Sequence, residues 1–119
     1  MSQSHQLVGK HFCLDYTGCK ETLSDVDNVR LKMFSAIEAS GMTLLSYNEH
    51  IFTNTNGYTG VFALSGSHAS IHTYPENNSC FIDLFACDEN CSHMQFDQIL
   101  RDFLQPSHVN TMLFWRGSV

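Results

Sequence analysis

Side chains that could move protons alternate with apolar ones in two neighbouring stretches of the chain. In the stretch 67–74, alternate positions hold His68, Ser70, His72 and Tyr74, and the positions between them hold Ala69, Ile71 and Thr73. In the stretch 79–87, Phe81, Asp83, Phe85 and Cys87 alternate with Ile82, Leu84 and Ala86. Successive side chains of a strand point to opposite faces of a sheet, so each stretch predicts one apolar and one polar face. A polar face with a thiol and an imidazole suits proton transfer, and the same pattern also fits a face that meets water.

Other chemistries fit these residues less well. His68 and His72 are four residues apart, which on a strand spans about 13 Å and is too far for one metal ion. Cys87 and Cys91 lack the paired Cys-x-x-Cys spacing of zinc sites. Ser67 is not in a Gly-x-Ser-x-Gly nucleophile elbow, and no glycine-rich phosphate loop is found. The sequence therefore predicts no metal centre, no hydrolase triad and no nucleotide phosphate site.

Composition predicts one compact domain over residues 1–119. Hydrophobic residues make up 43% of the 119 positions and charged residues 15%, which argues against disorder. The net charge of −6 argues against nucleic acid and anionic membranes as partners. The five cysteines are an odd set, no export signal is visible, and no apolar run is long enough to cross a bilayer. These features predict reduced thiols and a cytoplasmic location.

Periodicity places these residues in an α+β fold. Strands are expected at 7–16, 42–52, 59–65, 67–74, 79–87 and 108–115, and helices at about 24–40 and 92–105. The first helix is indicated by apolar residues at helical spacing and a following Gly41, and the second by the capping pair Ser92 and Gln95. This order predicts a mostly antiparallel β-sheet with both helices packed on one face. Trp115 and the phenylalanines of the helices are expected in the core.

Two segments resemble the signature of a known family. Residues 65–76 read Ser-Gly-Ser-His-Ala-Ser-Ile-His-Thr-Tyr-Pro-Glu, and residues 81–87 read Phe-Ile-Asp-Leu-Phe-Ala-Cys. They resemble the bacterial and archaeal S-adenosylmethionine decarboxylase proenzymes, whose usual form is Ser-Glu-Ser-His-x-[Ser/Thr]-Ile-His-Thr-Trp-Pro-Glu, followed by Asp-[Ile/Leu]-Phe-Thr-Cys. Residues 9–11, Gly-Lys-His, and 57–61, Gly-Tyr-Thr-Gly-Val, also match in place. The similarity runs from about residue 7 to the C-terminus.

The resemblance implies a self-processing decarboxylase with a pyruvoyl group and the α/β sandwich of that family. The serine that matches Ser67 attacks the carbonyl before it, so cleavage is expected between Gly66 and Ser67. The products would be the chains 1–66 and 67–119. The pyruvoyl group formed from Ser67 would bind the substrate amine as a Schiff base and accept the electrons released with carbon dioxide.

The resemblance also implies roles for individual residues. His72 matches a histidine that assists processing, and Thr59 stands where the family usually has a serine that helps this step. Cys87 matches the thiol that returns a proton to the substrate carbon. Phe52 and Tyr74 match aromatic residues that hold the adenine, with Tyr74 replacing a tryptophan, and Glu76 matches a carboxylate near the site.

One departure from the family pattern bears on the substrate. Gly66 stands where the family has a glutamate associated with the ribose hydroxyls of the substrate. Its absence leaves the acyl shift possible and weakens the case for nucleoside recognition. The leading function is decarboxylation of S-adenosylmethionine for polyamine (spermidine) biosynthesis. The alternatives are a pyruvoyl decarboxylase of ornithine or arginine, and an unprocessed binding or regulatory relative. The family's small protomers pair across a two-fold axis, so a homodimer is expected.

Overall fold

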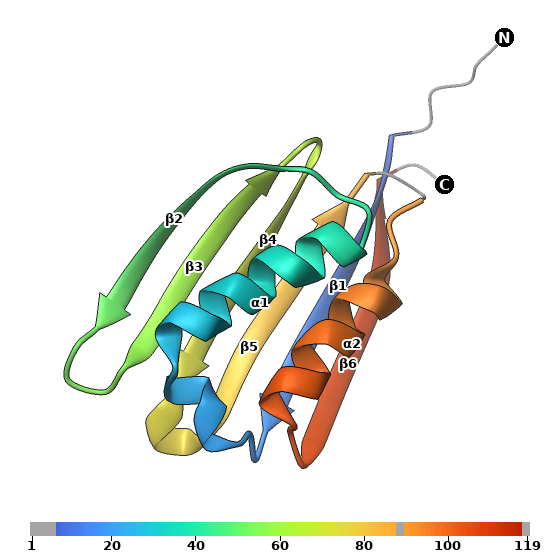
Figure 1. Cartoon of the computed structure of the whole chain (residues 1–119). Coiled ribbons are helices and arrows are strands. Elements are labelled where there is room, and N and C mark those ends of the chain that lie inside the picture. The colour runs from blue at the N-terminus through green and yellow to red at the C-terminus, as the bar shows by residue number, and fades with distance from the viewer. Residues whose placement is uncertain (1–6, 88–89, 118–119) are drawn as a thin grey trace, which may run out of the picture.

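The structure is a computed structural model that describes residues 7–87 and 90–117. Six strands form one sheet in the order β2-β3-β4-β5-β1-β6, and every neighbouring pair is antiparallel. The strands are β1 (Val8–Thr17), β2 (Leu44–Phe52), β3 (Gly57–Leu64), β4 (Ser67–Tyr74), β5 (Ser79–Ala86) and β6 (His108–Gly117). The first strand of the chain thus lies between the last two strands (Figure 1).

Two helices, α1 (Val26–Ala39) and α2 (His93–Leu104), begin and end at recognisable caps. The side chain of Asp25 accepts from the backbone N–H of Asn28, and that of Ser92 accepts from the N–H of Gln95. Gly41 follows α1 with a φ of 88°, the left-handed conformation that ends helices. Two short 3₁₀ helices, η1 (Glu21–Ser24) and η2 (Pro75–Asn77), were not expected from the sequence.

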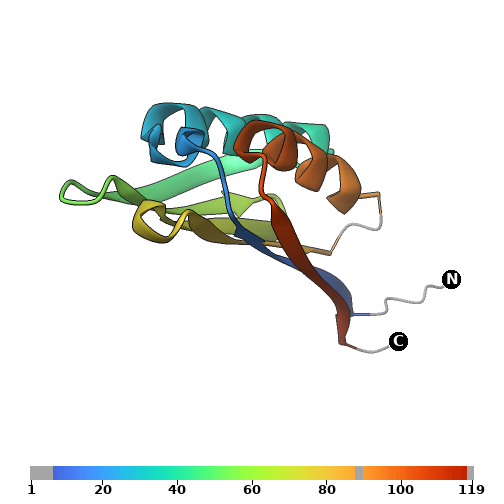
Figure 2. The ribbon, with the colours of Figure 1, turned by 90° about the horizontal axis from the view of Figure 1, so that it is seen from below.

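Both helices cover the same face of the sheet, as Figure 2 shows, and the hydrophobic core lies between the two layers. Along β4 and β5, the apolar set predicted by alternation is buried against the helices: Ala69, Ile71, Thr73, Ile82, Leu84 and Ala86. The opposite face, here called the outer face, carries the polar set of these two strands. The α+β architecture, the antiparallel sheet and the placement of the helices are therefore confirmed.

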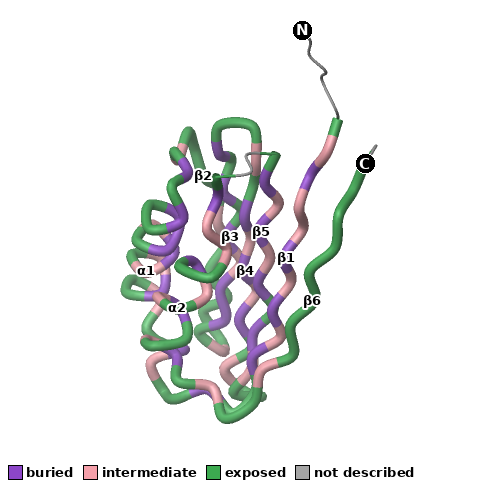
Figure 3. Tube along the Cα trace, turned by 90° about the vertical axis from the view of Figure 1, so that its right-hand side faces the viewer, coloured by how far each residue is buried: buried purple, intermediate pink, exposed green. Residues whose placement is uncertain are grey.

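The edge strand β6 departs from expectation. It is exposed along most of its length (Figure 3), and Trp115 is 57% exposed, so the prediction that Trp115 lies in the core is wrong. The physical reason is its place at the sheet edge, where β6 has only β1 as a neighbour. No helix in the described part of the chain is long and apolar enough to span a membrane.

Candidate active site

The bond predicted to be cleaved lies in the tight turn between β3 and β4. Leu64 pairs with Ser67, so Ser65 and Gly66 alone form the connection. Gly66 has a φ of 73°, as a type II turn requires at its third position, and glycine adopts this conformation without strain. A Cβ added at Gly66 would meet nothing within 4 Å. The Gly66–Ser67 peptide is therefore at an open turn with room for chemistry around it.

Ser67 and Cys87 lie together at this end of the sheet. Ser67 pairs with Ala86 across β4 and β5, and the backbone N–H of Cys87 donates to Ser67 Oγ at 3.4 Å. Cys87 is exposed, and Ser67 is half-buried. The pairing of β4 with β5 thus brings the Ser67 hydroxyl to the backbone of Cys87, the residue that follows β5.

Thr59 and His72 lie together at the other end of the same strands. They are register partners between β3 and β4, and Thr59 Oγ1 lies 3.3 Å from His72 Nδ1. The hydroxyl can therefore orient the imidazole, either by donating to Nδ1 or by accepting from it. Both side chains are half-buried on the outer face.

A pocket of about 270 Å³ opens beside this pair. Phe52, Tyr74 and Glu76 line it together with Thr59 and His72, and Asn54, Thr55, Gly57 and Thr73 complete the wall. Small-molecule sites usually measure about 300–1,000 Å³, so this pocket has room for part of a nucleoside-sized ligand. Phe52 and Tyr74 are 46% and 40% exposed, so their aromatic rings are accessible to a ligand that stacks on them.

The two ends of β4, one with Ser67 and the other with His72, are far apart within one chain. Ser67 begins β4 and His72 lies five residues along it, and five residues of strand span about 17 Å. The structure therefore brings Ser67 together with Cys87, and His72 together with Thr59, Phe52, Tyr74 and Glu76. It does not bring the first group to the second.

A half-buried ion-pair network holds the strands behind the pocket. Arg30 on α1 forms a bidentate pair with Glu49 on β2, with N–O distances of 2.7 and 2.9 Å. Tyr58, which is fully buried, donates its hydroxyl to Glu49 Oε1 at 2.7 Å. The hydrogen bond from Arg30 lowers the pKa of Glu49, and burial raises the pKa of Tyr58. The network ties α1 to β2 and β3 on the face opposite the pocket.

Sequence reasoning missed some of these residues. Asn54 and Thr55 line the pocket from the turn after β2, where their types indicated only a turn. His11 was noted in the family motif without a role, and in the structure its Nε2 lies 2.7 Å from Asp83 Oδ2. Alternation placed Asp83 on the polar face, but nothing local indicates that β1 pairs with β5.

Comparison with known proteins agrees with this architecture. The family model described as S-adenosylmethionine decarboxylase matches residues 10–117. A protein of Methanococcus vannielii named S-adenosylmethionine decarboxylase proenzyme is 37% identical over 113 residues, covering 94% of this chain and 92% of its own. A protein of the same name from Hydrogenobaculum is 33% identical and covers 94% of this chain and 84% of its own.

A solved structure agrees as well. The adenosylmethionine decarboxylase of Aquifex aeolicus superposes with a TM-score of 0.83 at 25% identity, covering 97% of this chain and 95% of its own. The matched region contains both strand ends described above and the turn between β3 and β4. The chain belongs to the S-adenosylmethionine decarboxylase family.

Proposed function

We propose that this protein is a self-processing, pyruvoyl-dependent decarboxylase that acts on S-adenosylmethionine and supplies the aminopropyl donor for spermidine biosynthesis. The observation that carries the proposal is the hydrogen bond from the Cys87 backbone N–H to Ser67 Oγ beside an open Gly66 turn, in a chain of this family. Nothing in the site favours ornithine, arginine or a purely binding role. The odd number of cysteines supports reduced thiols and a cytoplasmic location.

The turn fits the formation of a pyruvoyl group. Ser67 Oγ attacks the carbonyl carbon of Gly66, the peptide nitrogen leaves that carbon, and an ester joins the two residues. The missing Cβ at Gly66 and the open space around it ease this change of geometry. Elimination then removes the α-proton of Ser67 and releases residues 1–66 as a free carboxylate, and an imidazole such as that of His72, oriented by Thr59, suits the role of base. The enamine left at residue 67 becomes an imine, and water replaces its nitrogen, which leaves as ammonia. The resulting chains are 1–66 and 67–119.

The residues beside Ser67 suit the decarboxylation. A pyruvoyl group supplies a carbonyl that captures the substrate amine and draws electrons from the departing carboxylate. The thiol of Cys87 is exposed, and the backbone N–H of the same residue donates to Ser67 Oγ, which supports a role for this thiol in returning a proton to the substrate carbon. In the pocket, Phe52 and Tyr74 would hold the adenine ring and Glu76 would accept hydrogen bonds from the ribose hydroxyls.

The distance between Ser67 and His72 within one chain supports an active site that is shared by two copies of the chain. A span of about 17 Å prevents His72 from reaching the Ser67 of its own chain while β4 stays extended. A copy docked by its outer face, with its strands reversed, would bring the partner's His72 and the partner's pocket over Ser67 and Cys87. Because such an interface is two-fold symmetric, each dimer would contain two equal sites.

The outer face has the character of such an interface. On the outer face, five of the six strands carry apolar residues that are 40–50% exposed: Phe52, Val61, Tyr74, Phe81, Met112 and Phe114. Apolar side chains that gather on an exposed face often mark a protein interface, and the proposed dimer would cover these. The homodimer is therefore part of the proposed function, since each active site needs groups from both subunits.

One experiment tests the function. The purified chain is followed by denaturing mass spectrometry and by release of labelled carbon dioxide from S-adenosylmethionine, ornithine and arginine in parallel. We expect two fragments, 1–66 and 67–119, and release from S-adenosylmethionine. Ser67→Ala should stay intact. A parent chain that stays intact would support the binding or regulatory alternative, and release from ornithine or arginine alone would overturn the substrate.

A further inference from the structure

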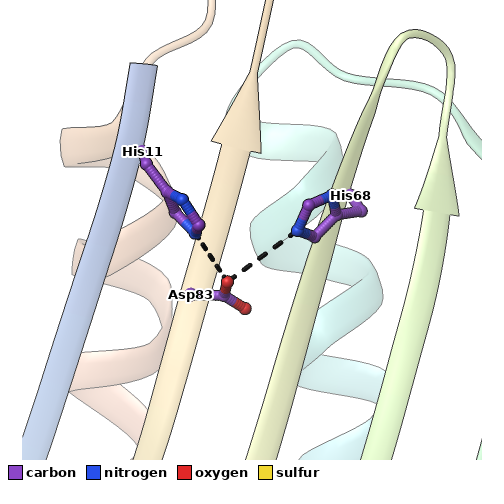
Figure 4. A group of neighbouring side chains, drawn as sticks. All are labelled: His11, His68 and Asp83. Carbon is purple, nitrogen blue, oxygen red and sulfur yellow. Dashed lines mark hydrogen bonds and ion pairs between the residues drawn. The ribbon is translucent and has the colours of Figure 1, made fainter. Parts of the chain in front are cut away.

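Three potential metal ligands converge on the outer face from three different strands. His11 of β1 and His68 of β4 both turn their Nε2 atoms toward the carboxylate of Asp83 on β5, as Figure 4 shows. The distances to Asp83 Oδ2 are 2.7 Å from His11 and 3.9 Å from His68. All three donor atoms lie within 4.8 Å of one another.

These separations fit a single cation. Zinc binds imidazole nitrogen and carboxylate oxygen at about 2.0–2.2 Å, so tetrahedral geometry sets donors about 3.4 Å apart. The observed separations bracket that value, and rotation of the side chains is enough to reach it. We propose that His11, His68 and Asp83 form a binding site for a divalent transition-metal cation of the zinc type. The site revises the sequence-based expectation of no metal, which considered His68 only with residues near it along the chain.

Neighbouring groups hold the three ligands in place. Ser70 donates its hydroxyl to Asp83 Oδ1, which leaves Oδ2 directed at the two imidazoles. The ring of His68 stacks on Phe85 with centroids 5.5 Å apart, and that of His11 lies 5.3 Å from the ring of Phe114. Supporting hydrogen bonds and packing of this kind orient metal ligands and raise affinity.

The donor set indicates which class of cation fits. Two imidazole nitrogens and one carboxylate oxygen suit zinc, cobalt, nickel or iron, whereas magnesium and calcium prefer oxygen ligands alone. Three protein ligands leave a position for water or another donor. The side chains of His11, Asp83 and His68 are 16%, 24% and 46% exposed, so a cation can reach them in the separate chain.

One neighbour opposes the cation. The guanidinium of Arg116 lies 3.5 Å from His11 Nδ1. When a cation takes Nε2, the imidazole proton must sit on Nδ1, where it faces this positive donor rather than an acceptor. Arg116 is exposed near the end of β6 and can turn away, but its presence lowers the affinity. Arg116→Gln should therefore bind the cation more tightly than the parent.

The test uses the full chain after treatment with a chelator, in the Ser67→Ala form so that binding is measured independently of processing. Cobalt(II) is added and its visible absorption is recorded, and zinc binding is measured by calorimetry. We expect one cation per chain and the intense absorption of a low-coordinate cobalt site. His68→Ala and Asp83→Asn should abolish this signal, and Ser70→Ala should weaken binding about 10- to 100-fold. His50→Ala, which removes another histidine of the outer face, is the matched control and should bind as the parent does.

Two results would overturn the proposal. One is the absence of a stoichiometric cobalt or zinc complex on the folded chain. The other is binding that persists in both His68→Ala and Asp83→Asn, because the cation would then lie elsewhere. Circular dichroism of each variant shows whether it is folded, and Ser70→Ala and Arg116→Gln give opposite expected shifts in affinity if a ligand variant fails to fold. Failure of self-cleavage would leave these outcomes unaffected.

Discussion

Thr59 Oγ1 lies 3.3 Å from His72 Nδ1, on register partners of β3 and β4 at the end of the sheet remote from Ser67. The hydroxyl and the imidazole form a unit beside the pocket of Phe52, Tyr74 and Glu76. This placement separates the groups that we propose for elimination and binding from the bond that we propose is cleaved.

Removal of the imidazole should stall processing. His72→Ala should stop at the ester between Gly66 and Ser67, because the acyl shift leaves the imidazole unused and elimination needs it as a base. Hydroxylamine should then split the chain, and denaturing mass spectrometry should show residues 1–66 as the hydroxamate. His108→Ala, at the exposed start of β6, is the control and should process fully. Complete processing of His72→Ala would remove its assigned role.

Two inactive variants should complement each other. Ser67→Ala cannot form the ester but keeps its His72, and His72→Ala keeps its Ser67. If each site combines the Ser67 of one chain with the partner's His72, mixed dimers will cleave the His72→Ala chain. Mass spectrometry of the co-refolded mixture should show fragments of that chain only. No cleavage in the mixture, although dimers form, would contradict the two-chain site.

Local periodicity was enough to predict the strands, the two α-helices and the buried faces of β4 and β5. Residues such as Ile71, Leu84 and Met33 contact one core. Their apolar types therefore recur at the period of a strand or a helix, and this period is visible over a few neighbouring residues. The order of the strands is different. β1 lies between β5 and β6, and pairings over more than 60 residues leave no local pattern. For this reason the approach of His11 to Asp83 could not be predicted.

In the candidate site, too, the sequence predicted which residues take part but not how they are arranged in space. Resemblance to the family identified Ser67, His72 and Cys87, but a motif gives no distance between its members. Extended backbone places residues five apart at opposite ends of a strand, so Ser67 and His72 lie apart although they are close in sequence. Trp115 shows a further limit, because its apolar type indicated the core while the edge position of β6 exposes it.

Loss of the thiol should separate processing from turnover. Cys87→Ala keeps the backbone N–H that donates to Ser67 Oγ, so self-cleavage should proceed. Without a positioned proton donor, release of carbon dioxide should fall about 10²- to 10⁴-fold. Labelled substrate with the processed variant gives the rate, and Cys13→Ala, a half-buried thiol of β1, is the control. Turnover of Cys87→Ala equal to that of the parent would make the residue an ordinary thiol.

Stability should fall in acid through Glu49. Its pKa is lowered in the folded chain by the hydrogen bond from Arg30, so the unfolded chain binds the proton more readily. The stabilisation is therefore complete above the ordinary pKa of about 4.3 and is lost as the pH falls through the lower folded value. Urea unfolding between pH 7 and pH 3 should show this loss. Glu49→Gln should be less stable at pH 7 and should show a weaker dependence on pH, whereas an unchanged dependence would assign the loss to other carboxylates.

The last prediction concerns Gly66 and the substrate. A carboxylate at this position would add a charge-assisted hydrogen bond to a ribose hydroxyl, worth about 1.5–3 kcal/mol, or roughly a ten- to hundredfold gain in affinity. The site has room for a side chain, but the φ of 73° costs a residue with a Cβ about 1–2 kcal/mol, so the turn should be less stable. Gly66→Glu should therefore process more slowly and, once processed, use S-adenosylmethionine at least as well as the parent. Gly66→Ala carries the same strain without the carboxylate and is the matched control. The ratio of kcat/KM for S-adenosylmethionine between the two processed variants isolates the carboxylate. A ratio near one would mean that the ribose hydroxyls are bound elsewhere, with Glu76 as the first candidate from the pocket.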